Sequence, residues 1–219
     1  MSNAQLDDYI ARHIDREPGH LYELDRDTNL ELINGRMCSG HLQGRILKML
    51  VRMVDPQLVL ELGTFSGYSA QCLAEGLRRD GAVVHTVEID DELEDFIARH
   101  LEQCPWRERI VTHIGDAMEI LPRLGLTFDL VYIDANKRHY TEYYRLAMEH
   151  LRDGGFIIAD NTLWDGKVAE AESGHTDPQT QGILDFNELV AADPRVETVI
   201  LPIRDGLTIL HKKTTNGIN

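Results

Sequence analysis

Two short apolar segments of the chain, 128–133 and 156–159, are each followed at once by side chains that carry oxygen. Asp134 follows the first segment, and Asp160 and Asn161 follow the second. Carboxylate and amide oxygens, with no thiolate or imidazole among them, suit Mg²⁺, Mn²⁺ or Ca²⁺ better than zinc. We therefore predict a divalent-cation site, with Mg²⁺ before the other two ions. The alternative is that both aspartates only cap loops.

Two further side chains near these donors could take part in a reaction. Lys137 lies three residues after Asp134 and could remove a proton from a hydroxyl group or stabilise the resulting oxyanion. A lysine pKa is ordinarily about 10.4, so action as a base requires a neighbouring cation to depress it. Trp164 could cover the ring of an aromatic substrate. The alternatives are a solvated lysine at a helix start and a tryptophan of the core. Three other side chains are weaker candidates: Tyr140, His139 and His41.

A glycine-bearing turn lies in the segment ELGTFSGYS (61–69). Gly63 and Gly67 let the backbone turn sharply and approach a ligand closely. A dinucleotide-binding turn would need a third glycine where Phe65 stands, which argues against a pyrophosphate. The acidic Glu61 would also repel an anion, whereas it suits an ammonium group. The pattern therefore favours a ligand with an ammonium group over a dinucleotide.

The next two apolar segments also end in residues that suit a ligand. Glu88 ends the first of them, and an acid at that place can accept hydrogen bonds from both ribose hydroxyls. Gly115, Asp116 and Ala117 follow the second and could hold the edge of an adenine. Together with Glu61, these residues describe a nucleoside with an amino-acid tail, which is S-adenosylmethionine. The alternative for Asp116 is a simple helix N-cap.

The elements that must position these residues alternate along the chain. Apolar segments expected as strands are separated by amphipathic helices, which is typical of a parallel sheet covered on both faces. Arg204-Asp205-Gly206 between the last two strands is a hairpin signal, so the last strand should be antiparallel. We predict a doubly wound α/β fold with a seven-stranded, mostly parallel sheet, and ligands at the carboxyl ends of its strands. The expected strands are 58–62, 83–88, 110–114, 128–133, 156–159, 196–201 and 207–211.

Length and composition limit the classes of function. The 219 residues are expected to form one domain, 1–219, with an N-terminal helical extension over 1–40. The net charge of −15 argues against binding to nucleic acid or to an anionic membrane. No apolar run approaches the roughly 18 residues of a membrane helix. Three widely spaced cysteines suggest neither disulfides nor a metal site, so we expect a cytoplasmic protein.

The motifs together resemble the cation-dependent O-methyltransferases, the family of catechol and caffeoyl-CoA O-methyltransferases and their bacterial relatives. The resemblance runs from about residue 30 to residue 213, and the pairing of IDANK with ADNTLW is its most specific part. It implies the Rossmann-like fold of the class I methyltransferases and a homodimer. The matching stretches are LELGTFSGYSA (60–70), VEID (87–90), GDA (115–117), DLVYIDANKRHY (129–140), GGFIIADNTLWDGKV (154–168) and RDG (204–206).

The resemblance also implies a role for individual residues. The methionine end of the cofactor is expected to contact Glu61, Gly63 and Ser69, and Ser39 and Asp134 are expected as further cofactor contacts. Its ribose is expected at Glu88, and its adenine at Ala117 with Asp116. The cation would be held by Asp134, Asp160 and Asn161. Lys137 and Asp134 would act at the reacting centre, with Trp164 against the acceptor.

We predict an S-adenosylmethionine-dependent and divalent-cation-dependent O-methyltransferase that acts on a small catechol-like or phenolic acyl acceptor. One alternative is a nicotinamide-dependent oxidoreductase on a Rossmann-like fold, against which Phe65 speaks. Another is a non-catalytic cofactor-binding protein. The intact set of Asp134, Lys137, Asp160 and Asn161 speaks against that reading.

Overall fold

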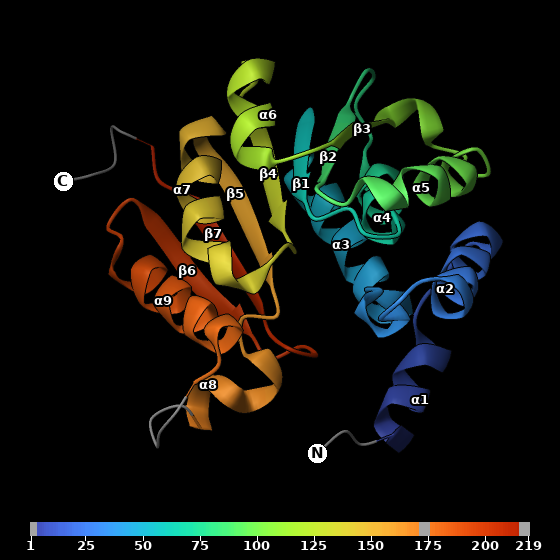
Figure 1. Ribbon diagram of the computed structural model, residues 1–219, viewed down its shortest axis with the longest axis horizontal. Coiled ribbons are helices and arrows are strands. Elements are labelled where there is room, and N and C mark those ends of the chain that lie inside the picture. Colours follow the sequence, from blue (N-terminus) through green and yellow to red (C-terminus); the bar gives the residue numbers. More distant parts are fainter. Residues whose placement is uncertain (1–3, 171–175, 215–219) are drawn as a thin grey trace.

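A seven-stranded sheet forms the centre of the computed structural model, which describes residues 4–170 and 176–214 (Figure 1). The order of the strands across the sheet is β3-β2-β1-β4-β5-β7-β6. Strands β1 to β5 are parallel, and β7 is antiparallel to both of its neighbours. The predicted sheet, including its antiparallel last strand, is therefore confirmed. The strands are β1 (Leu58–Leu62), β2 (Val83–Glu88), β3 (Ile110–Ile114), β4 (Phe128–Ile133), β5 (Leu151–Asp160), β6 (Val196–Leu201) and β7 (Leu207–Lys212).

Helices cover both faces of this sheet. The α-helices are α1 (Ala4–His13), α2 (Gly19–Glu31), α3 (Gly40–Val54), α4 (Tyr68–Gly76), α5 (Glu94–Leu101), α6 (Ala117–Leu124), α7 (Tyr140–His150), α8 (Lys167–Glu170) and α9 (Pro178–Ala192). Apolar residues of α2, α3, α4 and α5 pack on one face, and those of α6, α7 and α9 pack on the other. Consecutive residues of a strand point to opposite faces, so Leu130 belongs to the first core and Val131 to the second.

Strand β5 is longer than the apolar pattern indicates, because it begins at Leu151 rather than at Phe156. The additional residues include Gly154 and Gly155, which lie before the predicted strand. They lie at an irregularity in the pairing of β4 with β5, between the pairs Phe128–Leu151 and Leu130–Phe156. The earlier start of β5 does not affect its carboxyl end, and Asp160 is the last residue of the strand.

The chain between β6 and β7 turns back at Arg204, Asp205 and Gly206, as the hairpin signal predicts. Backbone bonds attach this turn to the segment after β5: Thr162 N donates to Gly206 O over 3.1 Å, and Leu163 N to Asp205 O over 2.7 Å. The C-terminal hairpin thus supports the loop that follows Asp160. In the described part of the chain, no helix combines the length and apolar character that crossing a membrane requires.

Candidate active site

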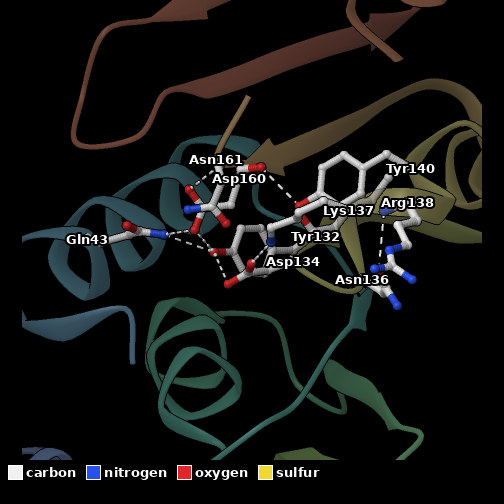
Figure 2. Close-up of polar contacts among 10 residues, drawn as sticks. Gln43, Tyr132, Asp134, Asn136, Lys137, Arg138, Tyr140, Asp160 and Asn161 are labelled. Carbon is white, nitrogen blue, oxygen red and sulfur yellow. Dashed lines mark hydrogen bonds and ion pairs between the residues drawn. The ribbon is translucent and has the colours of Figure 1, made fainter. Parts of the chain in front are cut away.

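The two aspartates predicted to bind a cation lie on either side of one phenol oxygen (Figure 2). Asp134 directly follows β4, and Asp160 ends the neighbouring β5. The hydroxyl of Tyr132 lies 3.5 Å from Asp134 Oδ2 and 3.1 Å from Asp160 Oδ2. The parallel register of β4 and β5 therefore brings both carboxylates to the same edge of the sheet, and Asn161 follows Asp160 there.

Asp160 is almost completely buried, with 4% of its surface exposed. Its Oδ1 accepts a hydrogen bond from Asn161 N over 2.8 Å, and its Oδ2 accepts from Gln43 Nε2 and Tyr132. Burial, together with the nearby charge of Asp134, raises the pKa of Asp160 above its ordinary value. Asp134 is less buried and is paired with Lys137, so the charge of Asp160 is the one that a bound cation would balance.

Asn161 has a backbone φ of 57°, in the left-handed region that asparagine tolerates better than most residues. Among the described residues there is no group of three or more His, Cys, Asp and Glu side chains placed to hold a metal. A cation site here depends on the amide oxygen of Asn161 as the third protein donor. That is a hard donor set of the kind Mg²⁺ and Ca²⁺ accept.

Lys137 is not a solvated lysine, since only 9% of its surface is exposed. Its Nζ lies 2.7 Å from Asp134 Oδ1 and 5.1 Å from the centre of the Tyr140 ring. Burial favours the neutral amine, but Asp134 and Tyr140 outweigh it and raise the pKa of Lys137 above its ordinary value. In this arrangement Lys137 is an ammonium group paired with Asp134, whereas action as a free base requires a depressed pKa.

The short turn that carries Lys137, from Lys137 to His139, is held from two sides. The side chain of Asn136 caps it by accepting from Arg138 N over 3.2 Å. Helix α9 packs so closely on it that a Cβ atom on Gly182 would lie 2.2 Å from the carbonyl oxygen of Lys137. Gly182 therefore allows the backbone contact that places the turn.

The glycine turn after β1 contacts the segment after β4. Gly63 has a φ of 96°, and a Cβ atom there would lie 2.2 Å from the carbonyl oxygen of Asp134. Any other residue would separate the two strand ends. Phe65, which stands where a dinucleotide turn has glycine, also adopts a left-handed conformation, with a φ of 48°. The sharp turn expected from Gly63 and Gly67 is therefore present, whereas the left-handed conformation of Phe65 was not predicted.

Glu61 is completely buried in β1, below this turn. Its Oε2 accepts a hydrogen bond from Thr86 Oγ1 over 2.5 Å. Its Oε1 is buried without a hydrogen-bond partner in the part of the chain that the structure describes. Burial raises the pKa of Glu61 to about 8, although the hydroxyls of Ser69 and Thr86 favour the charged form. An ammonium group beside Glu61 would satisfy the free oxygen and stabilise the carboxylate.

Glu88, at the end of β2, is nearly buried and accepts two backbone hydrogen bonds. Phe65 N donates to its Oε2 over 2.6 Å, and Asp90 N donates to its Oε1 over 3.0 Å. The carboxylate therefore holds the glycine turn, and each oxygen keeps a second lone pair for a hydroxyl donor. Asp116 caps α6 by accepting a hydrogen bond from Met118 N over 2.8 Å. This is the helix N-cap that the sequence allowed as the alternative role of Asp116. Ala117, the first residue of α6, is buried.

Trp164 is half-buried and has a φ of 47°. Its backbone N donates to Asp205 O over 3.1 Å, so the C-terminal hairpin holds it in place. Its indole Nε1 is buried without a hydrogen-bond partner among the described residues, and Lys167 Nζ lies 5.5 Å from its ring centre. A buried indole N–H without a partner differs from an ordinary core tryptophan, which usually has one.

The other candidates have structural contacts or no distinctive ones. Ser39 is buried directly before α3, and its hydroxyl does not cap that helix. His41 Nε2 lies 2.7 Å from Asp15 O, and the ring of His139 lies edge-on to Tyr143. Tyr140 is fully buried and donates to the backbone oxygen of Asp160 over 2.9 Å. Tyr140 thus joins α7 to the end of β5.

The fold and the site define a class I methyltransferase, with a doubly wound sheet whose strand ends carry the glycine turn and the buried acids. The chain belongs to the O-methyltransferase family, whose profile matches residues 12–213. The catechol O-methyltransferase of Niastella koreensis is 34% identical over 163 residues, which cover 73% of this chain and 72% of that protein. The caffeoyl-CoA O-methyltransferase of Stellaria longipes is 30% identical over 223 residues, covering 97% and 92%.

Two solved structures show the same similarity. An O-methyltransferase from Bacillus cereus, in complex with S-adenosylhomocysteine (SAH), aligns with a TM-score of 0.85 and 29% identity. The alignment covers 95% of this chain and 97% of that one. The O-methyltransferase TomG from Streptomyces achromogenes, in complex with S-adenosylmethionine, aligns with a TM-score of 0.87 and 26% identity, covering 98% and 100%. Family membership confirms the prediction of an O-methyltransferase, against the oxidoreductase and non-catalytic alternatives.

Proposed function

We propose that this enzyme transfers a methyl group from S-adenosylmethionine to a hydroxyl of a small catechol-like or phenolic acyl acceptor, with a divalent cation bound. The observation that carries the proposal is the pair of carboxylates, Asp134 and Asp160, on either side of the Tyr132 hydroxyl beside Lys137. Support also comes from relatives named catechol and caffeoyl-CoA O-methyltransferase. A vicinal diol can offer two oxygens to one cation, so a bound cation would favour catechols as acceptors.

We assign the cofactor to the carboxyl ends of β1, β2 and β3. Glu61 would pair with the ammonium group of its methionine tail, beside Gly63 and Ser69, because that buried carboxylate has a free oxygen. Glu88 would accept from the ribose hydroxyls. The adenine would lie at the backbone of Asp116 and Ala117. Ser39 and Asp134 complete the proposed cofactor contacts at the methionine end.

The residues at the ends of β4 and β5 fit a divalent cation. Among the described residues, Asp134 Oδ2 has only the 3.5 Å contact with Tyr132, and Asp160 Oδ1, which accepts from Asn161 N, keeps a further lone pair. Asp134, Asp160 and Asn161 would hold the cation through oxygen atoms, and Mg²⁺ would keep positions open for acceptor oxygens. When bound, the cation supplies positive charge that stabilises a phenolate.

The chain's own groups would prepare the acceptor for transfer. A phenol has a pKa of about 10, so near neutral pH it must lose its proton to become a good nucleophile. As an ammonium group, the buried Lys137 would hold positive charge beside the acceptor oxygen and stabilise the phenolate, while the phenol proton would pass to solvent. Trp164 would lie against the acceptor ring. Holding sulfur, methyl carbon and acceptor oxygen in line can supply roughly 7–11 kcal/mol.

We further propose a cytoplasmic homodimer. Cys38, Cys72 and Cys104 are all buried free thiols, which agrees with a reducing compartment. Large apolar side chains are exposed in the N-terminal third of the chain, and a second copy could cover them. They are Leu6, Tyr9, Tyr22, Leu30, Ile33, Met37, Met49 and Met53. Sedimentation equilibrium tests this, since a monomer at micromolar concentration contradicts it.

The function is tested with labelled S-adenosylmethionine and a panel of catechols, phenolic acids and phenolic thioesters. Methyl transfer should occur to vicinal diphenols, stop on addition of a chelator and return with Mg²⁺ or Mn²⁺. Asp160→Asn should lose this activation, because it removes a charged cation donor. Full activity in the chelator would contradict the role of the cation, and methylation of none of the acceptors would contradict the acceptor class.

A further inference from the structure

Gln43 and Tyr132 meet at Asp160, although they come from different elements (Figure 2). Gln43 lies on α3, one turn after its start, and is 5% exposed. Tyr132 lies in β4 and is fully buried. The Gln43 amide nitrogen donates to Asp160 Oδ2 and, over 3.0 Å, to the Tyr132 hydroxyl. The three side chains therefore form a closed triangle of hydrogen bonds.

The donors in this triangle can be assigned. A carboxylate only accepts hydrogen bonds, so the NH₂ end of the Gln43 amide must face Asp160. The amide has two protons, one for Asp160 Oδ2 and one for the Tyr132 oxygen. The hydroxyl proton of Tyr132 is then free to point to a carboxylate, either Asp160 at 3.1 Å or Asp134 at 3.5 Å. Gln43 on Oδ2 and Asn161 N on Oδ1 therefore orient the Asp160 carboxylate, and Tyr132 adds a third hydrogen bond when its proton points to Asp160.

We propose that Gln43 and Tyr132 are positioning residues for the divalent cation, which they serve by orienting Asp160 and setting its spacing from Asp134. The proposal rests on the cation-dependent function proposed above. Neither residue is a cation ligand in it. Hydrogen-bonding partners of metal ligands orient those ligands, and their loss typically weakens metal binding by about 10–100-fold.

Packing alone does not account for these two side chains. Tyr132 lies in the apolar core beneath α3, where phenylalanine would fill nearly the same space without a polar atom. Gln43 is on the buried side of an amphipathic helix whose other inward residues include Leu47 and Val51. Buried polar groups are tolerated when they are hydrogen-bonded, and the described partners of these two groups are each other and the carboxylates of Asp160 and Asp134. The polar groups of Gln43 and Tyr132 are therefore explained by their contacts with Asp160 and not by packing.

The test measures cation affinity rather than activity alone. Gln43→Leu and Tyr132→Phe remove the donors and keep most of the volume. We expect each substitution to weaken Mn²⁺ binding by about 10–100-fold. The electron paramagnetic resonance signal of free Mn²⁺ measures this affinity. The affinity for S-adenosylmethionine should stay within about twofold of the wild type. Raising the cation concentration should recover most of kcat. The double variant should lose less than the product of the single losses, because both groups act on the same oxygen.

Tyr144→Phe is the matched control. Tyr144 is also fully buried, and its hydroxyl also donates to a carboxylate, Asp193 Oδ2, over 2.8 Å, but between α7 and the end of α9. Its Mn²⁺ affinity should equal that of the wild type. The proposal is wrong if Gln43→Leu and Tyr132→Phe bind Mn²⁺ as tightly as the control does. If Gln43→Leu loses cofactor binding through misfolding, Tyr132→Phe decides. A wild type without any Mn²⁺ binding would refute the cation-dependent function itself.

Discussion

Glu61→Gln tests whether the buried acid of β1 has the protonation state that the structure indicates. Glu61 is completely buried, and its pKa is raised to about 8 by that burial. Glutamine has nearly the same shape and no ionisable proton. Any constant cost of burying its amide is the same at every pH, so only the pH dependence of the stability difference reports on Glu61.

The sign and size of this dependence follow from linkage. In the folded chain Glu61 keeps its proton up to about pH 8, whereas in the unfolded chain it loses it near its ordinary pKa of 4.5. Unfolding therefore releases a proton between these two pH values, and the free energy of unfolding of the wild type falls as the pH rises. The fall is about 1.4 kcal/mol per pH unit, or about 5 kcal/mol over the whole interval.

Urea unfolding of both proteins, without cofactor, measures the effect. The free energy of unfolding of Glu61→Gln minus that of the wild type should rise by about 3 kcal/mol between about pH 5.5 and pH 7.5. All other titrating groups are shared, so their contributions largely cancel in the difference. A difference that does not change with pH would refute the reasoning, because it would mean that Glu61 is already ionised in the folded chain.

The same variant tests the proposed contact with the cofactor. A hydrogen bond to a charged group contributes about 1.5–3 kcal/mol, so Glu61→Gln should bind S-adenosylmethionine roughly 10–150-fold more weakly. Binding to the wild type near pH 6.5 should also release a proton, since the ammonium group favours the ionised carboxylate. Calorimetry in buffers of different ionisation enthalpy detects that proton. Its presence in the variant would show that another group releases it.

Three other substitutions test neighbouring parts of the site. Glu88→Ala should weaken S-adenosylmethionine binding by roughly 1.5–3 kcal/mol in calorimetry, and unchanged affinity in a folded variant would reject the ribose assignment. Lys137→Met should lower kcat by about 10²–10³-fold with little change in KM for the phenol, because it removes positive charge beside the developing phenolate, whereas an unchanged kcat would leave activation to the cation alone. Without cation the same variant should also be about 3–5 kcal/mol less stable, because Asp134 loses its buried partner. Gly182→Ala should cost about 1–3 kcal/mol and lower kcat, whereas Gly19→Ala, with open space around it, should not affect turnover.

The sheet could be predicted because its signals are local. Short apolar segments such as 58–62 and 83–88 pack on both faces, which only buried parallel strands need. The Asp-Gly pair at 205–206 determined the direction of the last strand in the same way. Once the strands are parallel, their carboxyl ends lie at one edge, so the proximity of Asp134 and Asp160 follows from the topology.

The missed residues depend on contacts between distant segments. Gln43 is separated from Asp160 by 117 positions, and nothing in its helical pattern indicates which strand end it meets. Gly182 contacts the turn of Lys137 only because α9 packs there. Tyr132 was within reach of sequence reasoning, since alternation along a strand puts it on the same side as Asp134. A tyrosine ring also suits the core, so the sequence pattern does not distinguish a Tyr132 whose hydroxyl has a role from an ordinary core residue.

The buried polar residues show why the residues that the sequence did not predict are found at the candidate site. A core strand or an inward helix face normally carries apolar side chains, yet Gln43, Glu61, Tyr132 and Asp160 are all buried at the carboxyl edge of this sheet. Each would favour folding less than an apolar residue of similar size would, because a polar group must be removed from water. Glu61 also retains an oxygen without a partner among the described residues, which packing alone would not maintain. Departures from local patterning of this kind are expected where function opposes stability. They concentrate here at the strand ends where the proposed cofactor and cation would supply the missing positive charge.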